Sequence, residues 1–282
     1  MGTNKIAIGI SAALLLLVVL VYSVTDMETT AQLASSSEVT IEDTWELPKE
    51  LAEISGIAFL GEDKIVGVQD ENGVLYVYNL NSRKIEKQIE FGPNGDYEGV
   101  ALDRTTAYVL KTDGTIIVIE DYLTAAKVSE IKTGLTLEED PEGLCLDEQN
   151  NRLLVAIKGN DPKAEDSKGI YGIDLSRQKM LASPVYNIDL NSAVFKEVNE
   201  EELQETFKPS EINIHPETRQ IYLLEGQNPK LLILDPNGKP QEFFVLNETD
   251  FPQPEGLSFD QQGNVYISNE GSPATIHRIS IK

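Results

Sequence analysis

A short motif that recurs along the chain constrains the fold more than any other feature of the sequence. It reads YEGVALD at Tyr97–Asp103, and two close copies, DPEGLCLD and QPEGLSFD, span Asp140–Asp147 and Gln253–Asp260. Two weaker copies, ISGIAFL and PSEINIH, span Ile54–Leu60 and Pro209–His215. Successive copies are separated by 43, 44, 68 and 45 residues. Repeats of about 40 to 45 residues that each hold several short strands are typical of the blades of a β-propeller.

The runs inside each repeat predict how the ring of blades closes. The motif forms a first strand, and a β-rich second run such as Ala107–Leu110 or Leu153–Ile157 follows it after a polar turn, as in a hairpin. The fifth repeat, from Glu255, has only three runs before Lys282, whereas the unmatched run Val39–Leu47 precedes the first repeat. We predict an all-β, five-bladed β-propeller in which this N-terminal strand completes the last blade and leaves no open sheet edge.

The long interval between the third and fourth repeats predicts an insertion. Asn191–Phe207 is strongly acidic and carries apolar residues at Val194, Val198 and Leu203. This spacing indicates one amphipathic helix of three to four turns, although the interval is also the one place where a sixth blade would fit. The insertion joins a fourth strand to the next first strand, so we expect it to lie over the end of the channel where the first strands begin.

The N-terminal region predicts attachment to a membrane. Ile6–Val24 contains 19 residues without a charge, which is long enough to cross the hydrocarbon core as a helix. Lys5 precedes this run and Asp26 follows it, so the positive-inside rule places the N-terminus in the cytoplasm and the propeller outside, in the periplasm or an equivalent extracytoplasmic space. The predicted division is an anchor at residues 1–24, a flexible tether at 25–37 and the propeller at 38–282. A cleaved signal peptide is the alternative.

The overall charge excludes one class of partner. The chain of 282 residues has a net charge of −24, and a surface this acidic repels the phosphates of nucleic acids and anionic lipid headgroups. Contact with the membrane is therefore expected through the N-terminal helix only. Cys145 is the one cysteine in the sequence, so no intramolecular disulfide forms, and its apolar neighbours predict a small buried residue. The ligand or partner protein is not identified by the sequence.

The repeat positions predict a cluster of carboxylates. The first strand of every propeller blade lines the central channel, so Glu98, Glu142 and Glu255, at one repeat position, should converge at one mouth. Ser55 and Ser210 hold this position in the other repeats. The second strand is antiparallel to the first, and its end therefore returns to the same mouth. The residues placed there are Asp70, Lys111, Lys158, Glu225 and Glu270, with Glu211 one position after Ser210.

Clustered carboxylates repel one another unless cations lie among them. Calcium accepts six to eight oxygen ligands with flexible geometry, so it suits such a group, whereas zinc prefers the nitrogen and sulfur ligands that this mouth lacks in the sequence. The predicted metal ligands are drawn from Glu98, Glu142, Glu255, Glu211, Glu225 and Glu270. The alternative is that these glutamates accept backbone N–H groups between blades or pair with Lys111 and Lys158.

The three EG copies, the divergent PSEIN copy and the single apolar N-terminal segment together resemble the SdiA-regulated family, the YjiK-like bacterial proteins. The resemblance covers Val39–Lys282. It implies a five-bladed propeller, distantly similar to the NHL-repeat proteins, with a bound calcium ion, attachment to the bacterial cell membrane and no established activity.

Two functions follow from these observations. The first is a membrane-anchored, extracytoplasmic, calcium-binding propeller that acts as a binding or scaffolding module. The second is a calcium-dependent hydrolase of a lactone or phosphate ester, with the metal as Lewis acid at the channel mouth. The G-x-S-x-G motif and a glycine-rich phosphate loop are absent from the sequence, and His215 and His277 lie in no nucleophile–base pattern. We therefore assign no catalytic residue and favour the binding module.

Overall fold

A computed structural model describes residues 38–282, with the exception of 163, 199 and 201. Val39–Lys282 forms one compact unit. The predicted membrane anchor at residues 1–24 and the predicted tether at 25–37 lie outside the described residues. Within the part of the chain that the structure describes, no helix is both long enough and apolar enough to cross a bilayer.

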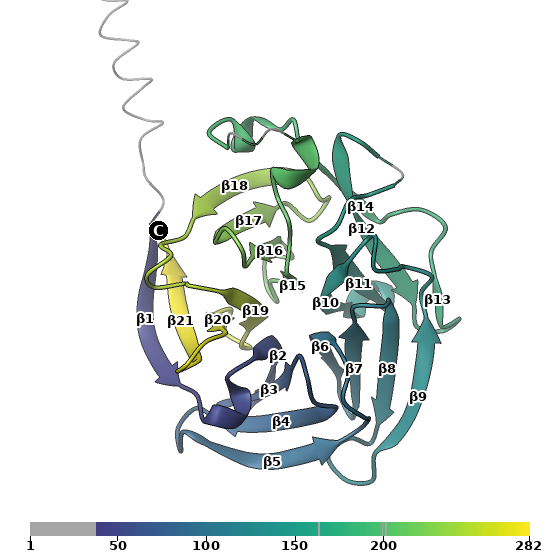
Figure 1. Cartoon of the computed structure of the whole chain (residues 1–282), viewed down its shortest axis with the longest axis vertical. Helices are drawn as coiled ribbons and strands as arrows, with labels where there is room; N and C mark the ends of the chain where they lie inside the picture. Colours follow the sequence, from purple (N-terminus) through teal and green to yellow (C-terminus); the bar gives the residue numbers. More distant parts are fainter. Residues whose placement is uncertain (1–37, 163, 199, 201) are drawn as a thin grey trace, which may run out of the picture. The chain divides into compact units, whose positions relative to one another are not determined.

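Five antiparallel sheets surround a central axis, and each is one blade of a propeller (Figure 1). Blade 1 consists of β2 (Ile54–Gly61), β3 (Lys64–Gln69), β4 (Val74–Asn79) and β5 (Lys84–Glu90). Blade 2 consists of β6 (Tyr97–Asp103), β7 (Thr106–Lys111), β8 (Thr115–Glu120) and β9 (Lys127–Lys132). Blade 3 consists of β10 (Pro141–Asp147), β11 (Arg152–Ile157), β12 (Ser167–Asp174), β13 (Lys179–Met180) and β14 (Tyr186–Asp189).

Blade 4 consists of β15 (Glu211–Ile214), β16 (Ile221–Glu225), β17 (Lys230–Leu234) and β18 (Pro240–Val245). Blade 5 consists of β19 (Pro254–Phe259), β20 (Val265–Asn269), β21 (Thr275–Ile281) and β1 (Val39–Glu46). In Figure 1 the inner strands β2, β6, β10, β15 and β19 surround the centre, and they are the five copies of the sequence motif. The prediction of five blades is confirmed.

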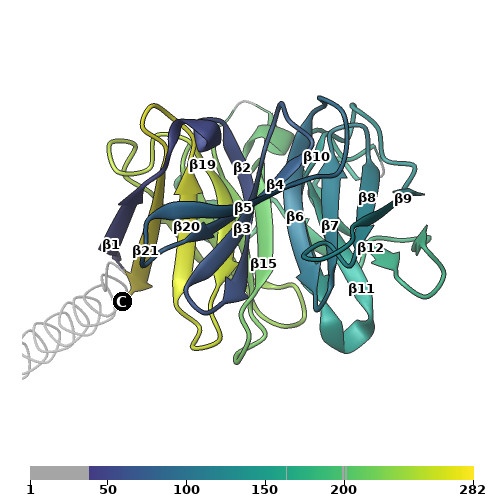
Figure 2. The same cartoon turned by 90° about the horizontal axis from the view of Figure 1, so that it is seen from below.

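The first strand of the described chain closes the ring. β1 pairs antiparallel with β21, from Val39 opposite Ile281 to Glu46 opposite Thr275. The last blade therefore takes its outer strand, β1, from the start of the propeller sequence and its other three strands from the end of that sequence (Figures 1 and 2). This confirms the predicted closure, in which β1 is the fourth strand of the fifth sheet.

The core lies between neighbouring blades because each sheet packs its two faces on two neighbours. Strands in the middle of a blade are thus buried on both faces and read as continuous apolar runs rather than as alternating ones. In β11, the run Leu153–Ile157 has no exposed surface at any position. Clusters of buried side chains fill the spaces between blades 1 and 2, 2 and 3, 3 and 4, 4 and 5, and 5 and 1.

The glycine of the motif allows inner strands of adjacent blades to approach closely. A Cβ atom added to Gly99 in β6 would lie 2.7 Å from Cβ of Leu144 and 2.8 Å from the carbonyl oxygen of Glu142, both in β10. Neither backbone can move away without disturbing its own sheet, so this position excludes a side chain. The divergent copy carries Glu211 in place of the glycine, and its side chain contacts the backbone of blade 3, as described below.

The segment between blades 3 and 4 does not form the predicted helix. Its described residues contain two single 3-10 turns instead, η3 (Ala193–Phe195) and η4 (Leu203–Glu205). Phe195 and Phe207 are buried against Phe243 of blade 4, with ring centroids 5.2 and 6.4 Å away. These two anchors fix the path of the segment, and the like charges of its glutamates, three and four residues apart, disfavour a continuous helix. The helix prediction was therefore wrong.

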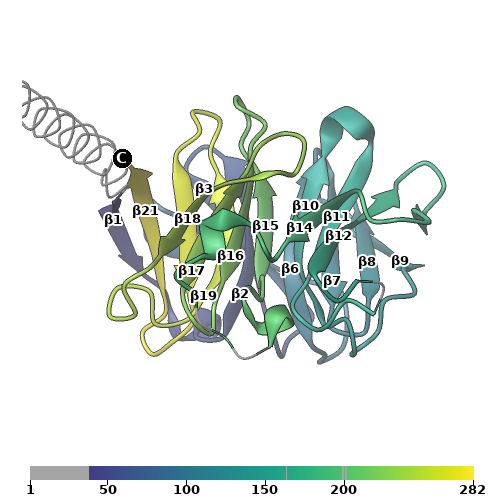
Figure 3. The same ribbon diagram turned by 90° about the horizontal axis from the view of Figure 1, so that it is seen from above.

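Part of the insertion nevertheless reaches the end of the ring at which it was expected. The backbone N–H of Lys208, just after η4, donates to Oε2 of Glu225 at the end of β16, at 3.0 Å. Figure 3 shows a green turn of the insertion at the same end of the ring as the purple turn η1 (Lys49–Leu51), which leads into β2.

Candidate functional site

The channel has two ends of different chemistry. We call the end at which the inner strands begin the acidic mouth, defined by Glu98, Glu142, Glu211 and Glu255. The end at which they finish we call the opposite mouth. Glu98, Glu142 and Glu255 each occupy the second position of their inner strand, β6, β10 and β19. Strand geometry and the five-fold arrangement thus bring residues that are far apart in sequence to one place.

The three predicted glutamates lie within electrostatic range of one another. The pKa of Glu98 is raised to about 7, chiefly by burial and in smaller part by the neighbouring Asp96 and Glu255 carboxylates, against the effect of a hydrogen bond from Thr112. The Thr112 hydroxyl donates to Glu98 Oε1 at 3.0 Å. Burial also raises the pKa of Glu142 well above its ordinary value, and the charges of Glu98 and Glu255 add to this effect. The pKa of Glu255 is raised by burial.

Glu211 lies buried at the boundary between blades 3 and 4. Its side chain is 1% exposed, and its Oε1 accepts the backbone N–H of Leu144 at 2.8 Å and that of Ile212 at 2.9 Å. Its other oxygen, Oε2, is buried and has no hydrogen-bond partner among the described residues. Burial raises the pKa of Glu211 well above its ordinary value, and the nearby charges of Glu255 and Glu142 act in the same direction.

One lysine offsets part of this charge. Nζ of Lys158, at the end of β11, lies 2.7 Å from Glu142 Oε1 and donates a hydrogen bond to it. The Glu142 charge raises the pKa of Lys158 against the opposing effect of burial, and the Glu255 charge adds to the rise. Lys111, the other lysine predicted here, instead lies 3.5 Å from Asp113. Two contacts thus agree with the alternative prediction, in which the glutamates have partners within the protein. Lys158 pairs with Glu142, and Glu211 accepts a backbone N–H across a blade boundary.

The two remaining predicted ligands have other neighbours. Glu225 has no exposed surface, and its Oε1 forms an ion pair with Lys230 of its own blade at 2.7 Å. Burial raises the pKa of Glu270 to about 7, with a hydrogen bond and charge repulsion from Glu53 as the next causes. Gln253 donates a hydrogen bond to Glu270. Glu225 is therefore fixed within blade 4, whereas Glu270 belongs to the rim between blades 5 and 1.

No group of three or more His, Cys, Asp or Glu side chains that could hold a metal ion occurs among the described residues as they are placed. Glu98 and Glu142 face hydrogen-bond donors of the protein instead, and Glu211 uses one of its two oxygens in this way.

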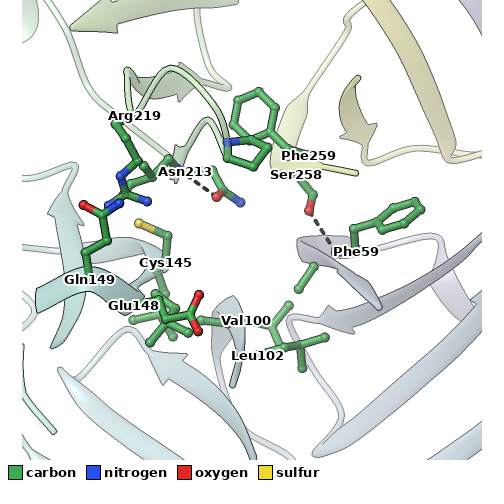
Figure 4. Close-up of a pocket in the computed structure, with 16 residues that line it drawn as sticks. Phe59, Val100, Leu102, Cys145, Glu148, Gln149, Asn213, Arg219, Ser258 and Phe259 are labelled. Atoms are coloured by element: carbon green, nitrogen blue, oxygen red, sulfur yellow. Dashed lines mark hydrogen bonds between the residues drawn. The ribbon is translucent and has the colours of Figure 1, made fainter. Parts of the chain in front are cut away.

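The sequence did not predict the cavity at the opposite mouth. This cavity, of about 400 Å³, is formed by the final residues of the inner strands, with every blade contributing (Figure 4). Cys145, buried as predicted, packs in the core between blades 3 and 4, and Ser258 contributes a hydroxyl to the cavity. Ser258 Oγ accepts the backbone N–H of Phe59 at 2.9 Å, across the boundary between blades 5 and 1.

A buried ion network supports one side of this cavity. Asp147 is 1% exposed and lies between two arginines: Arg152 Nε is 2.9 Å from its Oδ2, and Arg219 Nη2 is 2.8 Å from its Oδ1. In the sequence, the feature that could have indicated this network is the aspartate at the end of each full copy of the motif. The equivalent Asp260 accepts the backbone N–H groups of Gln262 and Asn264 in the turn that follows.

The sequence matches the model of the SdiA-regulated family over residues 30–280. The chain belongs to the SdiA-regulated family. No curated protein matches this sequence.

Three solved structures illustrate how widely the fold of this SdiA-regulated protein occurs. The glutaminyl cyclase of Myxococcus xanthus is 14% identical, with 86% of this chain and 96% of that chain covered and a TM-score of 0.63. The PQQ-bound aldose sugar dehydrogenase of Streptomyces coelicolor is 11% identical, with 88% and 99% covered and a TM-score of 0.54. A structural genomics protein of unknown function from Bacteroides thetaiotaomicron is 14% identical, with 83% and 56% covered and a TM-score of 0.53. At these identities the likeness shows the fold alone.

Proposed function

We propose that this protein binds calcium at the acidic mouth and acts as a binding or scaffolding module. The observation that carries the proposal is the imbalance of charge around Glu98, Glu142, Glu211 and Glu255. Each has a raised pKa, and the one ammonium group within the described mouth that opposes this rise is that of Lys158. Carboxylates in such excess, two of them buried and two half-buried, favour a cation among them.

The chemistry of the donors fits calcium. All four groups offer carboxylate oxygens, and the buried Oε2 of Glu211 has no partner among the described residues. Calcium accepts oxygen ligands in variable number and geometry, so it tolerates a site whose ligands come from four separate blades. Bound calcium would supply positive charge and hold the start of four inner strands together. Glu98, Glu142, Glu211 and Glu255 are the proposed ligands, and Glu225 is excluded from the set because Lys230 and Lys208 occupy its two oxygens.

Calcium binding requires that the ion replace the Lys158 ammonium group beside Glu142. Lys158 now neutralises Glu142 at 2.7 Å, so Glu142 becomes a ligand only when the ammonium group leaves it. The Lys158 side chain is 28% exposed and is therefore able to swing toward solvent without entering the core. We infer that the lysine acts as a tethered cation, which stabilises the mouth in the absence of calcium and competes with calcium for it.

The proposed location is the outer side of a bacterial cell membrane. It rests on the charge-free segment Ile6–Val24, with Lys5 before it and Asp26 after it, and on the relation of this family to membrane attachment stated above. A calcium-dependent hydrolase of a lactone or phosphate ester remains the second candidate, and no contact among the described residues favours it over the binding module.

Calorimetric titration of the full chain with Ca²⁺ tests the proposal. We expect saturable binding by the wild type and its loss in the double variant Glu98→Gln and Glu142→Gln, in which the polar contacts of both side chains can still form. Glu130→Gln, on the exposed outer strand β9, is the matched control and should bind as the wild type does. No binding by the wild type, or equal binding by the double variant, would exclude this site.

A further inference from the structure

The cavity at the opposite mouth has the size and shape of a site for a small molecule. Its volume of about 400 Å³ lies at the lower end of the range for ligand pockets. Val100, Leu144, Leu146 and Ile214 line it from three blades, but Val100 and Leu144 are at most 2% exposed, and most of the exposed lining is polar. The Ser258 hydroxyl lies on its wall (Figure 4). The interior therefore suits a small polar or charged molecule.

A positive group with fixed orientation lies at the edge of this cavity. Arg219 lines it, and its Nη2 donates to Asp147, which is 1% exposed and is also held by Arg152. A guanidinium has five N–H donors in a rigid plane, and this ion pair uses one of them. The others are suited to a carboxylate, which arginine recognises with paired hydrogen bonds.

A negative group lies at the same opening. Glu148, the first residue of the turn η2 (Glu148–Asn150), is exposed, lines the cavity and directs its carboxylate toward the space in Figure 4. A ligand with only a negative charge would be repelled by Glu148, and one with only a positive charge would be repelled by Arg219. A small ligand that carries both charges satisfies both residues.

We propose that the opposite mouth binds a small zwitterion, such as an amino acid. The ligand carboxylate pairs with Arg219, its ammonium group pairs with Glu148, and the rest of the ligand occupies the cavity that both residues line. This site is separate from the acidic mouth, because its residues are at the ends of the inner strands rather than at their starts. The proposal is therefore independent of calcium binding.

Three related ligands test the role of each ligand charge without any change to the protein. The probes are L-leucine, N-acetyl-L-leucine and L-leucinamide, which share one side chain and carry both charges, the negative charge alone and the positive charge alone. Calorimetry on the full chain should show saturable binding of leucine. Each capped form should bind at least about tenfold more weakly, the usual effect of losing one charged contact of about 1.4 kcal/mol.

Variants assign each charge to its residue. In Glu148→Gln, N-acetyl-leucine should bind at least as tightly as leucine, and in Arg219→Gln, leucinamide should do so. Arg219→Lys, which keeps the charge, should retain the preference for leucine and excludes a folding defect as the cause. Arg177→Gln, in an exposed outer turn, and Glu90→Gln, on the outer strand β5, are matched controls and should leave binding unchanged. Absence of saturable leucine binding, or equal binding of the three probes to the wild type, would overturn the proposal.

Discussion

The two mouths of the channel are built from the same strands, but they differ in how far the charges of their acidic side chains are neutralised. At the opposite mouth, Asp147 lies between Arg152 and Arg219, so its charge is fully matched. At the acidic mouth, four glutamates face one lysine and their pKa values are raised. A matched buried acid is a structural element. An unmatched cluster is unfavourable for folding by itself, and the proposed binding function rests on this difference.

The largest effect that separates the two mouths is expected from Asp147→Ala. Removal of this carboxylate leaves Arg152 and Arg219 without their shared partner, and a broken buried ion pair typically costs about 3–5 kcal/mol. Urea denaturation at pH 7 measures the loss. Asp43→Ala is the control, because Asp43 pairs with Arg278 on the partly exposed β1 and β21 and should cost at most about 1 kcal/mol. A loss of similar size in both variants would contradict the structural role of Asp147.

The acidic mouth should make the protein less stable as the pH rises. Below pH 4.5 Glu98 is protonated in both the folded and the unfolded chain and contributes nothing. Between pH 4.5 and about 7 only the unfolded chain releases this proton, so the free energy of unfolding falls, and above pH 7 the loss is complete. A shift of this size corresponds to about 3 kcal/mol.

Denaturation curves at pH 5 and pH 8 in calcium-free buffer measure this slope. Glu98→Gln should reduce it, because glutamine does not titrate and still accepts the Thr112 hydroxyl. Calcium should restore stability at pH 8 in the wild type if it binds the ionised carboxylates. A wild-type protein that is more stable at pH 8 than at pH 5 without calcium would contradict the raised pKa of this cluster.

Lys158→Met sharpens the comparison by removing the only ammonium group that pairs with Glu142 among the described residues of the acidic mouth. Calcium should bind about tenfold more tightly, because it no longer displaces a lysine that contributes on the order of 1–2 kcal/mol. In the absence of calcium the variant should be less stable than the wild type at pH 8. Unchanged calcium affinity in a variant that binds calcium would show that Lys158 does not compete, while the site itself would stand.

The fold was predictable because a propeller repeats its own pattern. Five copies of one motif and the unmatched run Val39–Leu47 determine both the number of blades and the closure by β1. The convergence of Glu98, Glu142 and Glu255 followed from their equal positions in the repeat. These inferences need only the order of strands, and strand order is encoded locally.

The remaining features depend on contacts between blades, which a single repeat does not encode. Arg219 lies in a turn of another blade and contacts Asp147 from there, so the motif of neither blade predicts the ion network at the opposite mouth. The path of the insertion is set by Phe195 and Phe207 against Phe243, and this tertiary contact overrides the helical spacing of its apolar residues. Departures from a repeat are the positions at which such contacts arise.

Glu211→Gln gives the smallest expected effect on stability and the most direct contrast with Asp147. The glutamine Oε1 retains both backbone hydrogen bonds that Glu211 accepts, from Leu144 and Ile212, and the change removes a buried group that is repelled by Glu142 and Glu255. We expect the free energy of unfolding at pH 7 to stay within about 1 kcal/mol of the wild type or to rise, while calcium affinity falls. A loss of several kcal/mol would mean that the Glu211 charge is matched in the folded protein, and the acidic mouth would then be a structural element like Asp147 rather than a binding site.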